Sequence, residues 1–164
     1  MKKIPIRQLG ATHQQAPATG QFKIRKVEEF AGDTDLVHDL HRHDFFFILA
    51  LKKGDGIHKI DFTPYKVLDH SVFFLRPGQV HQLELKAGSS GYLVEFNTAF
   101  YHPKDKVSIG RLRKASNKNF CELQIDRFNR ILEILASMFK EYKTKEEGYQ
   151  EVIKASLDIF FIEF

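Results

Sequence analysis

The seven residues 45–51 are apolar without a break, and this run constrains the fold more than any other feature of the sequence. The run is far too short to cross a bilayer, which requires about 20 residues. Its length suits a β-strand, in which successive side chains point to opposite faces of the sheet. We therefore expect a buried strand in a sheet that is covered on both faces.

Turn-forming residues divide residues 21–100 into short segments of strand length. Between the turns lie runs that alternate between apolar and polar residues, such as residues 57–62. Turns at intervals of about 8–12 residues are typical of an antiparallel sandwich or barrel. The turn signals are Gly32, residues 54–56, Pro64, residues 77–78 and residues 88–91. We predict a mainly-β fold with a closed antiparallel barrel over residues 21–103.

The apolar period changes to that of a helix from about residue 124. One apolar stripe has the spacing 3, 4, 3, 4, 3 and comprises Ile125, Phe128, Leu132, Leu135, Phe139 and Tyr142. A second stripe of Ile131, Ile134 and Met138 lies beside it, and another helical pattern follows residue 144. We predict a two-helix hairpin over residues 123–164 that packs on the barrel. Two stripes on one helix also favour a dimer interface formed by Ile131, Leu132, Leu135, Met138 and Phe139.

Two segments lack a strand or helix pattern. Residues 1–20 contain Gly10, Pro17 and Gly20 and show no apolar period, so we expect a flexible N-terminal arm. Residues 104–118 carry six basic residues against Asp105, for a local charge of +5. Such a segment could contact phosphates, but charge runs are more often solvated, and we expect a basic loop over residues 104–122.

The composition is that of one soluble domain. The chain has 164 residues, 28% of them charged, and a net charge of +4. Its single cysteine, Cys121, excludes an internal disulfide framework and cysteine-based zinc sites. The N-terminus lacks the apolar middle of a signal peptide, so we expect a cytoplasmic protein without membrane contact.

Three histidines occupy positions where chemistry is possible. His41 and His43 are two residues apart and share one face of a strand, and His81 follows the Pro77–Gly78 turn on a later strand. Three converging neutral imidazoles could hold a divalent metal. They could equally contact a small ligand, or form hydrogen bonds to the backbone at the mouth of a barrel. His58 alternates with apolar residues, and we expect it to be a core or surface histidine.

The motifs His41-x-His43 and Pro77-Gly78-x-x-His81 resemble the two short motifs of cupin barrels. In metal-dependent cupins a glutamate four residues after the second histidine completes the ligand set. Phe47 stands at that position and cannot ligate a metal. We therefore expect no metal and no other cofactor, with Phe47 facing a cavity.

A narrower resemblance covers residues 22–164. The order and spacing of residues 41–46, 54–62, 72–81 and 91–96, followed by the two helices, are similar to the sensing domain of AraC-type transcription regulators. This resemblance implies a cupin domain that binds a small-molecule effector inside the barrel and forms a homodimer through its helices. It also implies that DNA is bound only through a C-terminal helix-turn-helix domain, which we do not find in these residues.

These expectations assign the ligand contacts to five residues, namely His41, His43, Phe47, His81 and Tyr92. Tyr92 is included because a buried hydroxyl needs a partner. If the strand around it faces the other way, Glu95 becomes the carboxylate nearest the histidines. We expect no catalytic residues and no enzymatic activity. The alternatives are a metal-dependent cupin enzyme, a dioxygenase or isomerase with His41, His43 and His81 as ligands, and a cupin binding module without a DNA-binding partner domain.

Overall fold

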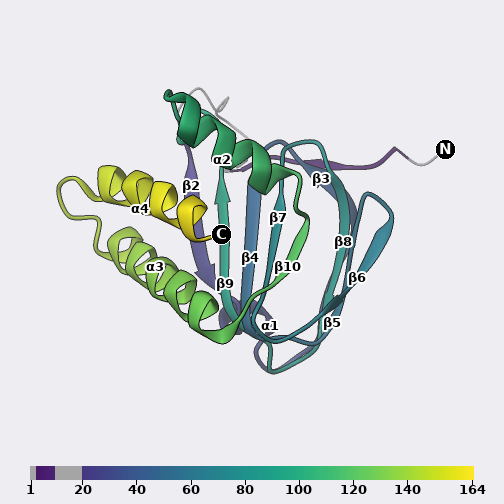
Figure 1. The fold of residues 1–164 in the computed structure, drawn as a ribbon. Coiled ribbons are helices and arrows are strands. Elements are labelled where there is room, and N and C mark those ends of the chain that lie inside the picture. The colour runs from purple at the N-terminus through teal and green to yellow at the C-terminus, as the bar shows by residue number, and fades with distance from the viewer. Residues whose placement is uncertain (1–2, 10–19) are drawn as a thin grey trace.

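The computed structural model describes residues 3–9 and 20–164, which form two five-stranded sheets packed face to face, with helices over one outer face (Figure 1). The sheet that carries His41, His43, His58 and His81 is called the histidine sheet. Its strand order is β1 (Ile6–Arg7), β3 (Leu36–His43), β8 (Val80–Leu85), β5 (Gly56–Ile60) and β6 (Thr63–Val67). The other is called the helix-backed sheet. Its strand order is β10 (Phe120–Glu122), β7 (Ser71–Leu75), β4 (Phe46–Lys53), β9 (Ser90–Phe96) and β2 (Phe22–Lys26).

The sheets do not close into the barrel that the sequence predicts. Each described strand pairs within one sheet only, so β1 and β6 are the edges of one sheet and β10 and β2 are the edges of the other. Alternating apolar and polar residues are typical of sandwiches and barrels alike, because both bury one face of every strand. The mainly-β prediction is therefore confirmed, and the closed barrel is wrong.

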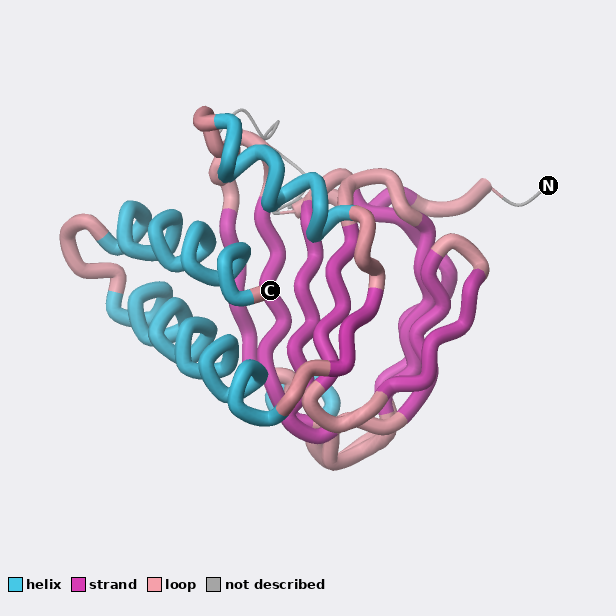
Figure 2. The backbone as a smooth tube through the Cα atoms, viewed as in Figure 1, coloured by secondary structure: helices cyan, strands magenta, loops and turns pink. Residues whose placement is uncertain are grey.

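Strand β4 is the centre of the molecule and has both faces buried, as its sequence predicts. Phe47, Leu49 and Leu51 point into the core between the two sheets. Phe46 and Ile48 point the other way, into a second core under the helices. Gly91 of β9 lets the neighbouring strands approach closely, since a Cβ there would lie 2.0 Å from the carbonyl oxygen of Ala50. The helix-backed sheet is therefore the middle layer of three (Figure 2).

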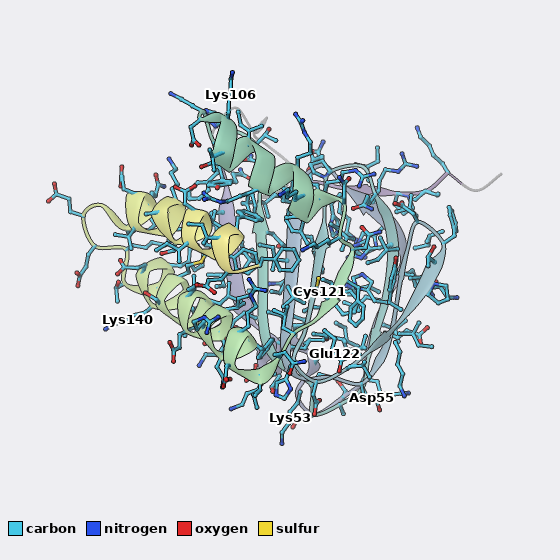
Figure 3. All side chains as sticks on the ribbon, in the orientation of Figure 1. Lys53, Asp55, Lys106, Cys121, Glu122 and Lys140 are labelled. Carbon is cyan, nitrogen blue, oxygen red and sulfur yellow. The ribbon has the colours of Figure 1, made fainter. Side chains whose placement is uncertain are left out.

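The predicted helical hairpin is present as α3 (Ile125–Thr144) and α4 (Tyr149–Glu163), but the described chain has two further helices. One is the short α1 (Glu28–Ala31), and the other is α2 (Lys106–Ser116), which replaces most of the loop expected over residues 104–122. Asp105 begins α2 by accepting a hydrogen bond from the backbone N–H of Ser108 at 2.8 Å. Arg113 and Lys114 lie in its last turn, where positive charge favours the helix dipole. Lys106 points away from the sheets at the other end of α2 (Figure 3).

The N-terminal segment is partly held in the fold. Strand β1 pairs in parallel with β3, with Ile6 opposite Arg42 and Arg7 opposite His43. The expected flexible arm is therefore wrong for these residues, because backbone hydrogen bonds fix them to the sheet edge. Residues 1–2 and 10–19 lie outside the described residues.

Three of the five residues that the sequence predicts at a dimer interface on α3 are buried in the core of this chain. Ile131, Leu135 and Met138 have no exposed surface, because they pack against the outer face of the helix-backed sheet. Leu132 and Phe139 are partly buried at the border of the same core. None of the helices in the described part of the chain is long and apolar enough to cross a membrane.

Candidate functional site

Four buried histidines meet on the inner face of the histidine sheet, and we call them the histidine cluster. His41 and His43 come from β3, His58 from β5 and His81 from β8. Hydrogen-bonded strand pairing brings them together, since His41 is opposite His81 and Ile60 of β5 is also opposite His81. The structure thus assembles His41, His43 and His81 as predicted. It adds His58, whose inward direction follows from its alternation with Ile60.

The ring nitrogens of the cluster lie within contact distance of one another. His41 Nε2 is 2.8 Å from His43 Nε2, which is 3.3 Å from His81 Nε2. His81 Nδ1 is 2.8 Å from His58 Nε2. The Nδ1 of His41 lies 2.5 Å from the carbonyl oxygen of Asp39, which can only accept, so this nitrogen carries the proton. The Nε2 of neutral His41 therefore presents a lone pair to the cluster.

Burial keeps the cluster uncharged. It lowers the pKa of His43 and of His58 to about 3, and neighbouring histidines add to the effect. Burial also lowers the pKa of His81 and of His41, with the charge of the other histidines adding to the effect at His81. Neutral imidazoles are the form that accepts hydrogen bonds or ligates metals. Within the described residues, His58 Nδ1 is a buried nitrogen without a hydrogen-bond partner.

Phenylalanine rings cover the side of the cluster that faces the other sheet. The ring centroid of Phe47 is 5.1 Å from that of His81 and 5.5 Å from that of His43. Phe45 stacks on His43 with centroids 4.3 Å apart and an interplanar angle of 11°. Phe47 therefore lies beside the histidines, as the sequence predicts.

A cavity of about 160 Å³ lies between the sheets beside His43, and we call it the inner cavity. Leu9, Phe45, Phe47 and Leu93 form its apolar surface. Its polar side chains are Arg7, Gln8, Lys23, Arg25, His38, His43 and Glu95. Three cationic side chains thus share the cavity with one carboxylate.

The strand alternation around Glu95 resolves the alternative left open by the sequence. Leu93 and Glu95 face the inner cavity, and Glu95 lies 3.9 Å from the guanidinium of Arg25. Burial raises the pKa of Glu95, and the charges of Arg25 and Lys23 partly oppose that rise. Glu95 is therefore the carboxylate that shares the cavity with His43.

Tyr92 lies on the opposite face of β9 from Leu93 and Glu95, so it packs against the core under the helices and not beside the histidines. Its ring is 5.8 Å from that of Phe139 on α3. It lines a separate surface groove of about 290 Å³ with Lys26, Glu28 and Leu132 among its neighbours. The cause is strand parity, because Tyr92 and Leu93 necessarily point to opposite faces.

Sequence reasoning missed five polar residues of the inner cavity, namely Arg7, Gln8, Lys23, Arg25 and His38. Lys23 and Arg25 alternate with Ile24, which faces the helices. This alternation in β2 was the signal that could have predicted that both side chains share the other face. Arg7 reaches the cavity through the pairing of β1 with β3, which no local pattern predicts. His38 faces inward because the strand register shifts between His38 and His41, as in a β-bulge.

Residues 29–103 match the family described as the AraC-like ligand binding domain. A cupin protein from Bacteroides fragilis is 15% identical with a TM-score of 0.38, over 55% of this chain and 75% of that one. The structure of wild-type ToxT from Vibrio cholerae with bound unsaturated fatty acid is 11% identical with a TM-score of 0.45. That match covers 90% of this chain and only 53% of ToxT, so the chain spans about half of its length. No curated protein matches the sequence.

Proposed function

Because residues 29–103 match the family described as the AraC-like ligand binding domain, we propose that this chain is the effector-sensing part of an AraC-type transcription regulator. A small molecule binds in the inner cavity without being chemically changed. The helix-turn-helix domain that contacts DNA lies outside these 164 residues, and the regulator acts in the cytoplasm. The free thiol of Cys121 suits that reducing compartment.

The inner cavity is the observation that carries this proposal. Ligand sites combine an apolar surface with a few placed polar groups, and here Phe45, Phe47 and Leu93 line the cavity together with His43 and Arg25. The volume of about 160 Å³ is small. Pockets for drug-sized ligands usually measure about 300–1,000 Å³. The inner cavity therefore suits a small metabolite better than a drug-sized molecule.

The packing suggests how an occupied cavity would influence the helices. Strand β2 lines the cavity with Lys23 and Arg25 and turns Ile24 toward the core under the helices. Strand β4 does the same with Phe47 and Ile48. An effector that binds one arrangement of these strands better than another shifts the population toward it. The position of α3 and α4 then depends on the effector.

We also propose that the domain forms a homodimer, through α4 instead of the buried stripe of α3. Val152, Ile159 and Ile162 are 43%, 50% and 53% exposed and, with exposed Ala155, repeat at the 3, 4, 3 spacing of helix–helix interfaces. Two acidic residues beside this stripe are engaged within the same chain. Asp158 accepts a hydrogen bond from the Tyr101 hydroxyl at 2.7 Å, and Glu163 pairs with Arg130 at 3.1 Å. They are therefore partly compensated and do not prevent a second copy from packing there.

The histidine cluster favours a second candidate function, a metal-dependent cupin enzyme such as a dioxygenase or isomerase. The potential ligand nitrogens of His41, His43 and His81 all lie within 4.8 Å of one another, and a divalent ion fits such a set of neutral imidazoles. The carbonyl of Asp39 and the ring of His58 hold the outer nitrogens of His41 and His81, an arrangement common around ligating histidines. A bound ion would supply Lewis-acid chemistry. Phe47 beside the set offers no fourth ligand, so we rank this function second.

The experiment that tests the proposed function is a thermal-shift screen with sugars, aromatic acids and divalent metals. We expect at least one small organic molecule to raise the melting temperature of the wild-type domain. The same molecule should not raise the melting temperature of Leu93→Trp, in which the new side chain fills the inner cavity. It should raise that of Val107→Trp, at an exposed position of α2, as much as that of the wild type. A shift that persists in Leu93→Trp, or no shift with any organic compound, would contradict the proposal.

A further inference from the structure

The inner cavity carries an excess of positive charge at one end. Arg7 and Lys23 are exposed side chains at its rim, and Arg25 is partly buried. Glu95 is the one carboxylate among the residues that line the cavity in the described chain. The cavity therefore has a formal charge of +2 with Glu95 ionised and +3 with Glu95 protonated.

Arg25 is held in place but has hydrogen-bonding capacity left over. Its guanidinium carbon lies 4.8 Å from the ring centre of Phe30, a cation–π contact that fixes the group. Its closest approach to Glu95 is 3.9 Å, which is too long for a hydrogen bond. Its Nε is buried and has no hydrogen-bond partner among the described residues. A buried donor without an acceptor is costly, so an acceptor supplied by a ligand would be favourable here.

Glu95 is a poor internal partner for these cations. Its side chain is only 12% exposed, and burial raises its pKa despite the three nearby positive charges. The carboxyl is thus costly to ionise where it stands, and at 3.9 Å it makes no hydrogen bond to the guanidinium of Arg25. The nearby side chains of His38 and His43 are neutral, because burial lowers their pKa values, so they add no charge to the cavity.

From this geometry, and resting on the proposed function, we infer that the effector is a small organic anion. Its acidic group binds Arg25, with Arg7 and Lys23 at the rim, and its apolar or aromatic body lies against Phe45, Phe47 and Leu93. Arginine presents a planar fork of donors that matches a carboxylate or a phosphate. A neutral sugar would leave the three cations without a counter-charge and would set its hydroxyls against phenylalanine rings.

Isothermal titration calorimetry with benzoate tests the inference, with phenyl phosphate as the second anion and benzamide as the neutral analogue. We expect benzoate or phenyl phosphate to bind at least tenfold more tightly than benzamide, and the tighter of the two identifies the acidic group. Raising the salt concentration should weaken the binding of the anion and leave the binding of benzamide unaffected.

Variants locate the binding to the three cations. Arg25→Gln should weaken the binding of the anion at least tenfold, because a charge-assisted hydrogen bond is lost. Lys23→Gln and Arg7→Gln, at the exposed rim, should weaken it about threefold each and keep the test valid if Arg25→Gln does not fold. Glu95→Gln removes the competing carboxylate and should tighten binding about threefold or more. Arg113→Gln on α2 is the matched control and should bind as the wild type does.

The failure of this inference is distinguishable from failure of the proposed function. Benzamide or a sugar that binds as tightly as the anions, with no effect of Arg25→Gln, would overturn the anionic effector and leave the effector-sensing domain standing. Anion binding that is unchanged by Arg25→Gln, Lys23→Gln and Arg7→Gln would also overturn it. If no carboxylate, phosphate, amide or sugar binds, the proposed function fails together with the inference.

Discussion

His41 Nε2 lies 2.8 Å from His43 Nε2, and the proton of neutral His41 is held on its other nitrogen by the carbonyl of Asp39. The imidazole of His43 can therefore donate to His41 only through its own Nε2, which also lies 3.3 Å from His81 Nε2. A single hydrogen atom on His43 Nε2 must be shared between His41 Nε2 and His81 Nε2, or serve only one of them. The arrangement thus leaves a lone pair directed toward the cluster interior, where a ligand donor or a cation could take it.

Elemental analysis separates the two candidate functions. We expect the domain purified without chelators to hold no stoichiometric transition metal, because Phe47 stands beside the three histidines in place of an acidic ligand. The measurement is metal content per protein by mass spectrometry. One equivalent of metal that is lost in His43→Ala and retained in His102→Gln, at an exposed histidine, would favour the enzyme over the effector-sensing domain.

The histidine cluster predicts destabilisation by acid. In the folded state the pKa values of His43 and His58 fall from 6.5 to about 3, so the unfolded chain binds more protons between these values. The free energy of unfolding should therefore decrease as the pH falls below about 6.5, by up to about 1.4 kcal/mol per pH unit for each histidine. Glu95 acts in the opposite sense, since its folded pKa is raised.

Urea unfolding at several pH values between about 7.5 and 4 measures this slope. His58→Phe should have a shallower slope than the wild type, because one proton-binding difference is removed. His102→Gln is the control and should follow the wild type. If the free energy of unfolding of the wild type instead rises steadily as the pH falls over this range, the cluster does not stay neutral in the folded protein.

Leu135 is predicted to stabilise the fold without any role in association. It is completely buried between α3 and the helix-backed sheet. Leu135→Ala should lower the free energy of unfolding by about 2–5 kcal/mol, the usual cost of such a cavity. Chemical denaturation measures the loss, and Ile159→Ala, at a half-exposed site, should lose much less. Equal losses in the two variants would place Leu135 outside the core.

Association is predicted to depend on the exposed stripe of α4. Ile159→Glu places a charge in the proposed interface and should weaken the dimer at least tenfold, since an unpaired charge is costly to bury. Light scattering coupled to gel filtration measures the mass. Val107→Glu, on α2 and 62% exposed, should dimerise normally. A wild-type domain that stays monomeric at micromolar concentrations would refute the proposed dimer.

The sequence predicted the features that depend on local periodicity. Strand β4, with both faces buried, follows from an unbroken apolar run, and the shared face of His41 and His43 follows from their spacing. The helical hairpin follows from the 3, 4 pattern after residue 124. In each case the pattern extends over a whole element, so that every residue in it indicates the same secondary structure.

Features that depend on the absolute direction of a strand or helix were not predictable in this way. Parity shows that Tyr92 and Glu95 point to opposite faces of β9, and only the packing shows that Glu95 points inward. The register shift before His41 changes the parity of β3, so His38 joins the cavity unexpectedly. On α3 both apolar stripes look alike, and only the sheet beneath them decides that Ile131 is in the core.

The most direct test of the effector site is the NMR spectrum of the histidine side chains during titration with the compound that gives the largest thermal shift. The account predicts that the imidazole signals of His38 and His43, which line the inner cavity, change in proportion to occupancy, while those of exposed His102 do not. Saturable binding that leaves His38 and His43 unchanged would contradict the account, because the ligand would then occupy some site other than the cavity between the two sheets.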